Sequence, residues 1–147
     1  MLISKNDLPV VDMEFMNDVH YEDVDIINDL FELIKAYDND ATQSNKDALN
    51  AKYQEWIDHT KDHFHGEEVL MVEKGFPPYP MHKGEHDKAL HEMQEIFERW
   101  QSSGDVSVLK IYFIEVLPTW LVNHIASMDM VTARFFKTGM SPCAAMH

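Results

Sequence analysis

Two pairs of potential metal ligands, each spanning one helical turn, lie near the middle of this 147-residue sequence. His63 is followed four positions later by Glu67, and His82 is followed four positions later by His86. At that spacing in an α-helix, two side chains lie on the same face, one turn apart. Each pair can therefore present two donor atoms to the same metal ion.

Further donors upstream and downstream complete a set of five imidazoles and two carboxylates. The candidate metal ligands are His20, His63, Glu67, His82, His86, His124 and Asp129. Imidazole nitrogen combined with carboxylate oxygen suits iron, zinc, manganese or copper better than magnesium or calcium. Seven ligands are too many for one tetrahedral zinc ion, but they fit two six-coordinate ions. Glu67 and Asp129 are the natural bridges because each has two oxygens, and iron is favoured because such a site leaves a position open for a redox-active diatomic molecule.

Four long helices are expected to carry these ligands. Apolar residues such as Val24, Ile27 and Ile34 recur at the three- and four-residue spacing of an amphipathic helix. Short joints between long helices favour antiparallel neighbours. The sequence therefore predicts an all-α, up-down-up-down four-helix bundle. The expected elements are an extended N-terminal arm (1–17), helices over about 18–37, 44–74, 81–101 and 105–137, and a short tail (138–147).

Capping residues, glycine and proline set the expected helix ends. Ser44, with Asp47 three residues later, resembles a capping box at the start of the second helix. Gly75 should end that helix, and the proline-rich segment 76–80 is expected to be a stiff, non-helical connection. Pro118 should kink the fourth helix or split it in two.

The spacing between His124 and Asp129 does not suit a regular helix. Five residues turn through about 500°, which leaves the two side chains about 140° apart. Asp129 must either reach in from the flank or follow an inserted residue in a π-bulge, a feature common at functional sites. We therefore predict a local irregularity between His124 and Asp129.

The composition disfavours several classes of partner. The net charge of −14 disfavours binding to nucleic acid and to anionic membranes. The segment up to Asp7 does not resemble a secretory signal, and no uncharged apolar stretch approaches the roughly 20 residues that span a bilayer. A cytoplasmic, monomeric protein with one domain over 1–147 is expected. Cys143 is the only cysteine, which excludes an internal disulfide and leaves a free thiol in the tail.

The balance of ligands indicates the kind of reaction. Ferritin-like diiron proteins use four carboxylates and two histidines from Glu-x-x-His motifs, and this sequence has no such motif. Five neutral imidazoles with two carboxylates place less negative charge on the metals and should stabilise a ferrous pair. Reversible oxygen binding is favoured on this basis, although the ligand set is also compatible with a slow oxidase.

The order and spacing of the seven ligands resemble the hemerythrin family, specifically its single-domain bacterial members. The flanking segments 16–22, 63–71 and 120–125 resemble the family too, and the likeness covers about residues 10–137. It implies that three histidines (His82, His86 and His124) hold one iron and that two (His20 and His63) hold the other, which keeps an open position. Glu67 and Asp129 would bridge both irons together with an oxo or hydroxo group.

The same resemblance implies a function and a ligand pocket. The expected function is reversible dioxygen binding, for carriage, storage or delivery to an oxygen-consuming enzyme, at a non-heme diiron centre. The alternatives are a diiron redox enzyme (peroxide or nitric oxide chemistry, or ferrous iron oxidation) and oxygen sensing through a separate partner. Leu121 and Trp120 precede His124 by three and four residues and are expected to line the oxygen pocket. The other histidines (His59, His65, His91 and His147) are expected to be solvated or to contact a ligand from outside.

Overall fold

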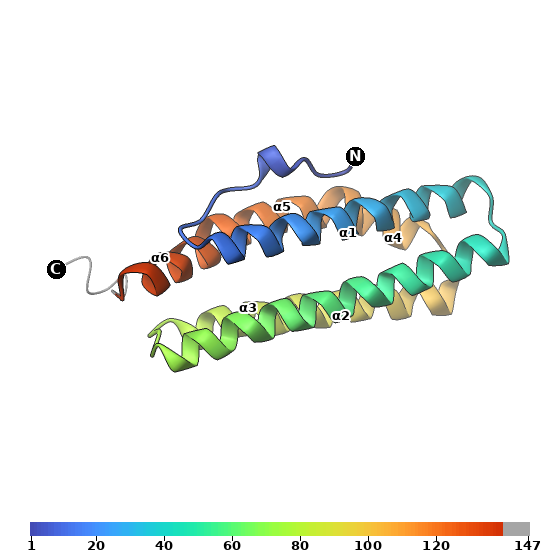
Figure 1. The fold of residues 1–147 in the computed structure, drawn as a ribbon. Coiled ribbons are helices and arrows are strands. Elements are labelled where there is room, and N and C mark those ends of the chain that lie inside the picture. Colours follow the sequence, from blue (N-terminus) through green and yellow to red (C-terminus); the bar gives the residue numbers. More distant parts are fainter. Residues whose placement is uncertain (140–147) are drawn as a thin grey trace.

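The chain forms a four-helix bundle without strands in the part that the computed structural model describes, residues 1–139 (Figure 1). The first three long helices are α1 (Glu14–Asn39), α2 (Gln43–Glu73) and α3 (Tyr79–Ser103). Five shorter segments, joined end to end, make the fourth: α4 (Ser107–Ile111), the π turn η2 (Tyr112–Val116), α5 (Leu117–His124), the π turn η3 (Ile125–Asp129) and α6 (Met130–Thr138). The expected all-α, antiparallel bundle is confirmed.

The N-terminal arm is shorter than expected, because α1 begins at Glu14 and not near residue 18. No side chain caps this end of the helix, so no capping residue marks this helix start in the sequence. Asn17 instead holds the arm to the helix. Its side chain accepts a hydrogen bond from Val11 N (2.9 Å) and donates one to Val11 O (2.9 Å). Asn28 pairs with the backbone of Ile3 in the same way, while η1 (Lys5–Asp7) forms a short 3-10 turn within the arm.

Two other expected helix ends were wrong. Thr42, not Ser44, caps α2, with its hydroxyl oxygen accepting a hydrogen bond from Asn45 N (3.1 Å). The segment 76–80 is not wholly non-helical, since α3 already begins at Tyr79 and includes Pro80. Proline is tolerated in the first turn of a helix because the N–H it lacks would have no partner there.

Pro118 does not split the fourth helix in two, because the helical stretch Ser107–Thr138 continues through it, with a π turn directly before it. Pro118 lies in the first turn of α5, directly after η2. The N–H of Leu117 there bonds to the carbonyl of Tyr112, five residues back. The wide turn thus accommodates the proline within the helical stretch.

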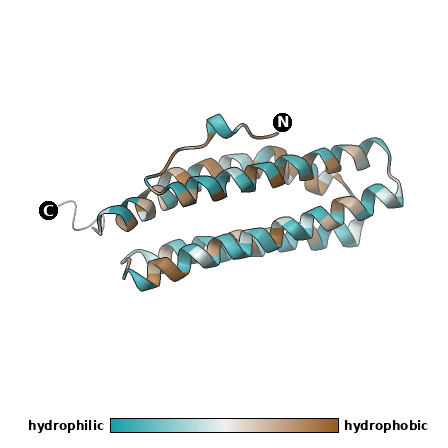
Figure 2. Cartoon of the chain, in the orientation of Figure 1, coloured by the Kyte–Doolittle hydropathy of each residue, from teal (hydrophilic) through white to brown (hydrophobic). Residues whose placement is uncertain are grey.

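The continuous helical stretch Ser107–Thr138 is long and apolar enough to cross a membrane by length and composition alone, with a mean hydropathy of 1.2. Several of its apolar side chains, such as Leu109 and Phe113, are buried in the bundle. Apolar and polar positions alternate along the helices in Figure 2, as amphipathic helices require. Packing in the bundle core accounts for part of this apolar stretch, since 39% of its most apolar window is buried.

The core has an aromatic half and a histidine-rich half. Near the joint between α1 and α2, Tyr53 stacks on Phe97 with ring centroids 4.4 Å apart, and its hydroxyl donates to Met93 O (2.7 Å). Trp100 is fully buried in the same half and donates to Asn50 Oδ1 (2.8 Å). The candidate ligands come from the opposite ends of the helices, where the antiparallel arrangement brings all four together.

Candidate metal centre

The seven candidate ligands converge in the histidine-rich half of the bundle, and each side chain is at most 6% exposed. α1 contributes one of them, α2 and α3 two each, and the fourth helix two. Their donor atoms form two groups, and within each group all lie within 4.8 Å of one another. The first group comprises His82, His86, His124 and Asp129, and the second comprises His20, His63 and Glu67.

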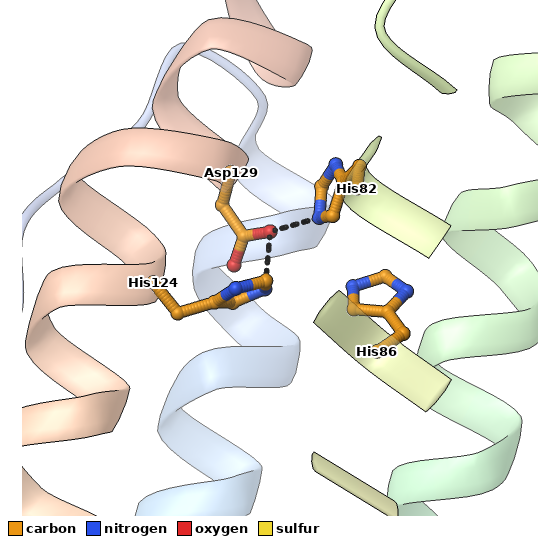
Figure 3. Close-up of side chains that lie close together, drawn as sticks. All are labelled: His82, His86, His124 and Asp129. Carbon is orange, nitrogen blue, oxygen red and sulfur yellow. Dashed lines mark ion pairs between the residues drawn. The ribbon is translucent and has the colours of Figure 1, made fainter. Parts of the chain in front are cut away.

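The two carboxylates connect the two groups. Asp129 Oδ1 lies 3.1 Å from both His82 Nε2 and His124 Nε2 (Figure 3), and its Oδ2 lies 2.9 Å from His20 Nε2. Glu67 is arranged likewise, because its Oε2 lies 3.0 Å from His63 Nε2 and its Oε1 lies 3.3 Å from His86 Nε2. Each carboxylate thus turns one oxygen toward each group.

Several inward-facing atoms are buried without a hydrogen-bond partner among the described residues. They include Glu67 Oε1, Asp129 Oδ1 and the Nε2 atoms of His82, His86 and His124. Buried polar atoms in proteins are usually satisfied, and a convergent set of lone pairs is satisfied by a cation. The donor set therefore fits a metal ion.

The opposite ring nitrogens of four histidines have partners from neighbouring helices. Such partners fix the tautomer and leave the Nε2 lone pair free to bind a metal. The pairs are His63 Nδ1 with Asp23 Oδ2 (2.8 Å), His82 Nδ1 with Thr132 Oγ1 (2.7 Å), His86 Nδ1 with Glu68 Oε2 (2.9 Å) and His124 Nδ1 with Glu85 Oε1 (2.7 Å). Sequence reasoning named none of these partners, because their contacts depend on how the helices pack.

The π turn η3 brings His124 and Asp129 onto one face. The N–H of Met130 bonds to the carbonyl of Ile125, five residues back, so the turn holds one residue more than a turn of α-helix. The predicted irregularity between His124 and Asp129 is confirmed. It removes the angular mismatch of about 140° that a regular helix would leave.

The buried charges perturb one another strongly. Burial would lower the pKa of His124, but the nearby carboxylates of Asp129 and Glu85 outweigh it and raise the pKa to about 9. Burial would raise the pKa of Asp129, but contacts with His124, His20 and His82 hold it well below its usual range. In the absence of metal, His124 and Asp129 thus form an ion pair, and a metal ion that binds His124 must displace its proton.

A cavity of about 30 Å³ lies beside the donor cluster. It is lined by both histidines of the second group, His20 and His63, and by His124 and Asp129 of the first group. Its wall is largely apolar and includes Ile27, Phe64, Met93, Leu117, Trp120 and Leu121. Leu121 is buried, and the Trp120 ring stacks on His124 with centroids 4.7 Å apart. Leu121 and Trp120 therefore line a cavity against the cluster.

The remaining histidines differ in their surroundings. His59 Nε2 lies 2.8 Å from Asp23 Oδ1, so this histidine approaches the cluster from outside. His65 and His91 are exposed. His147 and the expected free thiol of Cys143 lie outside the described residues.

An all-α bundle with a buried cluster of histidines and carboxylates defines a metal-binding four-helix bundle, and comparison with known proteins gives its family. The family model described as "Hemerythrin HHE cation binding domain" matches residues 14–135. The bacteriohemerythrin of Aquifex aeolicus is 31% identical over 134 residues, which cover 91% of this chain and 97% of that protein. The chain belongs to the hemerythrin family.

Other relatives share less of the chain. The bacteriohemerythrin of Methylococcus capsulatus is 27% identical over 79% of this chain and 86% of that protein. The myohemerythrin of Sipunculus nudus is 29% identical over 54% of this chain and 58% of that protein. No solved structure matches the chain.

Proposed function

We propose that this protein binds dioxygen reversibly at a non-heme diiron centre formed by the seven buried side chains. One observation carries the proposal: Glu67 and Asp129 each direct one oxygen to each of the two donor groups. A carboxylate placed in this way suits bridging two metal ions. A single ion would leave part of the buried donor set unsatisfied.

The two groups differ in the number of histidines that they supply. Three histidines (His82, His86 and His124) and one oxygen from each carboxylate would hold one iron. Two histidines (His20 and His63) and the other carboxylate oxygens would hold the second iron, which would keep a position open. When bound, the irons would supply the redox chemistry that holds dioxygen at the remaining position. Both histidines of the second group line the cavity, which supplies the space that an open position requires.

The residues of the chain would hold the ligand and exclude water. The cavity volume of about 30 Å³ exceeds the roughly 10–15 Å³ of cavity space that one water molecule requires. The cavity therefore has room for a diatomic molecule. Leu121 and Trp120 contribute apolar surface to it, which disfavours ordered water and protonation of the bound ligand. We assign these two residues to the oxygen pocket.

We propose a single-domain, monomeric, cytoplasmic protein that carries or stores dioxygen and supplies it to an oxygen-consuming enzyme. Five imidazoles with two carboxylates stabilise the ferrous pair and favour release of dioxygen over cleavage. Binding, and not turnover, is therefore the proposed activity.

The first experiment counts iron and follows visible spectra. The purified protein is reduced anaerobically, exposed to oxygen and then purged with argon. Two irons per chain, with an absorption band that appears with oxygen and fades on purging, are expected. His86→Ala should lose iron, whereas His91→Ala, which removes an exposed imidazole from the same helix, should not. Direct conversion to a stable ferric spectrum would favour a redox enzyme, and a protein that takes up no iron would overturn the assignment.

A further inference from the structure

We propose that His59 is a positioning residue that acts through Asp23 on His63, one of the histidines that line the cavity. This inference rests on the proposed metal centre and extends it to a residue outside the seven ligands. It assigns His59 a role in setting metal affinity at the position that borders the cavity.

The carboxylate of Asp23 lies between two imidazoles. Asp23 Oδ2 is 2.8 Å from His63 Nδ1, and Asp23 Oδ1 is 2.8 Å from His59 Nε2. His59 and His63 are four residues apart on α2, so they lie one turn apart on the face that meets α1. Asp23 follows His20 by three residues on α1, on the face that already supplies a ligand.

Asp23 depends on these two histidines for its polar contacts. Its side chain is only 7% exposed, and it makes no other polar contact with residues 1–139. A buried carboxylate without partners is strongly unfavourable. Each oxygen of Asp23 therefore needs its own imidazole, and His59 holds the outer one.

The other carboxylates behind ligand histidines are placed differently. Glu68, which contacts His86, is 15% exposed, and Glu85, which contacts His124, is 28% exposed. Water can complete the hydrogen bonding of both. Asp23 is less accessible than either, so a further side chain takes the place of water, and His59, with a side chain 24% exposed, links it to the surface.

Removing His59, the outermost residue of the contacts His63–Asp23–His59, should make the orientation of the His63 ring less fixed. Without His59, Asp23 Oδ1 is left buried and unpaired, and the carboxylate can turn away from His63 Nδ1. The His63 ring then loses the contact that fixes its orientation and tautomer. The metal position beside the cavity should weaken, while the three-histidine position should keep its affinity.

A matched pair of polar substitutions tests this chain of contacts. His59→Gln keeps an amide N–H near the position of the imidazole Nε2, whereas the shorter side chain of His59→Asn cannot reach Asp23. His65→Asn is the control, because it changes an exposed histidine on the same helix. Each protein is titrated anaerobically with cobalt(II), and the hyperfine-shifted imidazole N–H protons of the loaded protein are recorded by NMR.

The expected result is specific to one of the two bound ions. His59→Asn should lower the affinity for one cobalt ion about 10-fold, and one imidazole N–H should exchange faster with solvent. His59→Gln and His65→Asn should resemble the wild type. A wild-type affinity in His59→Asn would overturn the inference and leave the metal centre intact, and so would a loss in His59→Gln as large as that in His59→Asn. A wild-type chain that binds fewer than two cobalt ions would overturn the metal centre itself and this inference with it.

Discussion

Asp129 Oδ1 lies 3.1 Å from His124 Nε2, although five positions separate the two residues and a regular helix would point them about 140° apart. The π turn Ile125–Asp129 makes this contact possible by adding one residue to the turn. It also leaves Asp129 Oδ2 free to reach His20 on α1 at 2.9 Å. A local change in helix geometry thus allows one carboxylate to serve both donor groups.

Asp129→Asn should abolish binding of two metal ions. The amide has nearly the same shape as the carboxylate, but it lacks the negative charge and presents one oxygen in place of two. We expect fewer than two irons per chain, measured by elemental analysis after anaerobic reconstitution. Asp87→Asn, on the exposed face of α3, should keep the full complement. Two irons in Asp129→Asn would contradict a bridging role for Asp129.

Thr132→Val should weaken metal binding through His82. The hydroxyl of Thr132 is the partner of His82 Nδ1 at 2.7 Å, and valine has the same shape without that oxygen. Loss of such a partner lowers metal affinity about 10- to 100-fold, and a buried nitrogen left unpaired costs about 1–3 kcal/mol in the metal-free protein. Metal titration and urea unfolding measure the two effects. Thr132→Ser should restore both, and an unchanged affinity in Thr132→Val would show that Thr132 does not hold His82.

Leu121→Ala should enlarge the cavity beside the donor cluster. Leu121 is 6% exposed, and a buried Leu→Ala change destabilises a protein by about 2–5 kcal/mol. Water should enter the wider cavity, so the oxygenated protein should convert to the ferric form faster, as followed by visible absorption. Ile114→Ala, which changes a side chain 52% exposed on the same long helix, is the control. Equal conversion rates in the two variants would show that Leu121 does not keep water away from the bound ligand.

The helices and the ligand pairs within single helices could be predicted because both depend on local spacing, whereas the division of the histidines into two groups was implied by the family resemblance. Pairs such as His63 with Glu67 share a helix face wherever that helix lies. The misfit of five residues predicted a local irregularity, and a π-bulge was one of its two possible forms. Thr132 and Asp23 could not be predicted as partners of ligand histidines. Their contacts depend on how neighbouring helices are rotated and shifted relative to one another. The spacing of residues within one helix does not determine this arrangement.

The helix ends show the same limit of local reasoning. Glu14 starts α1 without a capping side chain, and the arm is instead held by two reciprocal hydrogen bonds between Asn17 and Val11. Tyr79 starts α3 one residue before Pro80, where a helix-breaking residue also fits a first turn. Both helix starts depend on tertiary contacts or on position within the helix, which the helix propensities of single residues do not describe.

The metal-free protein should lose stability as the pH rises from about 6.5 to about 9. Asp129 and Glu85 raise the pKa of His124 to about 9 in the folded chain, whereas an unfolded histidine titrates near 6.5. The folded state therefore binds this proton more tightly than the unfolded state does. The stabilisation that protonated His124 contributes is complete below about pH 6.5 and is lost as the pH passes about 9. The depressed pKa of Asp129 acts in the opposite sense, since its stabilisation is present above the ordinary aspartate pKa and disappears as the pH falls through the lowered one.

Urea unfolding of chelator-treated protein between pH 6 and pH 10 measures this loss. His124→Gln should show a flatter profile, because the titrating imidazole is gone. Protein loaded with metal should become more stable over the same range, because the metal competes with the proton for His124 Nε2 and binds better as that proton leaves. A metal-free profile that is flat between pH 6.5 and pH 9 would mean that His124 and Asp129 do not form an ion pair, and the proton displaced by the metal would have to come from another member of the cluster.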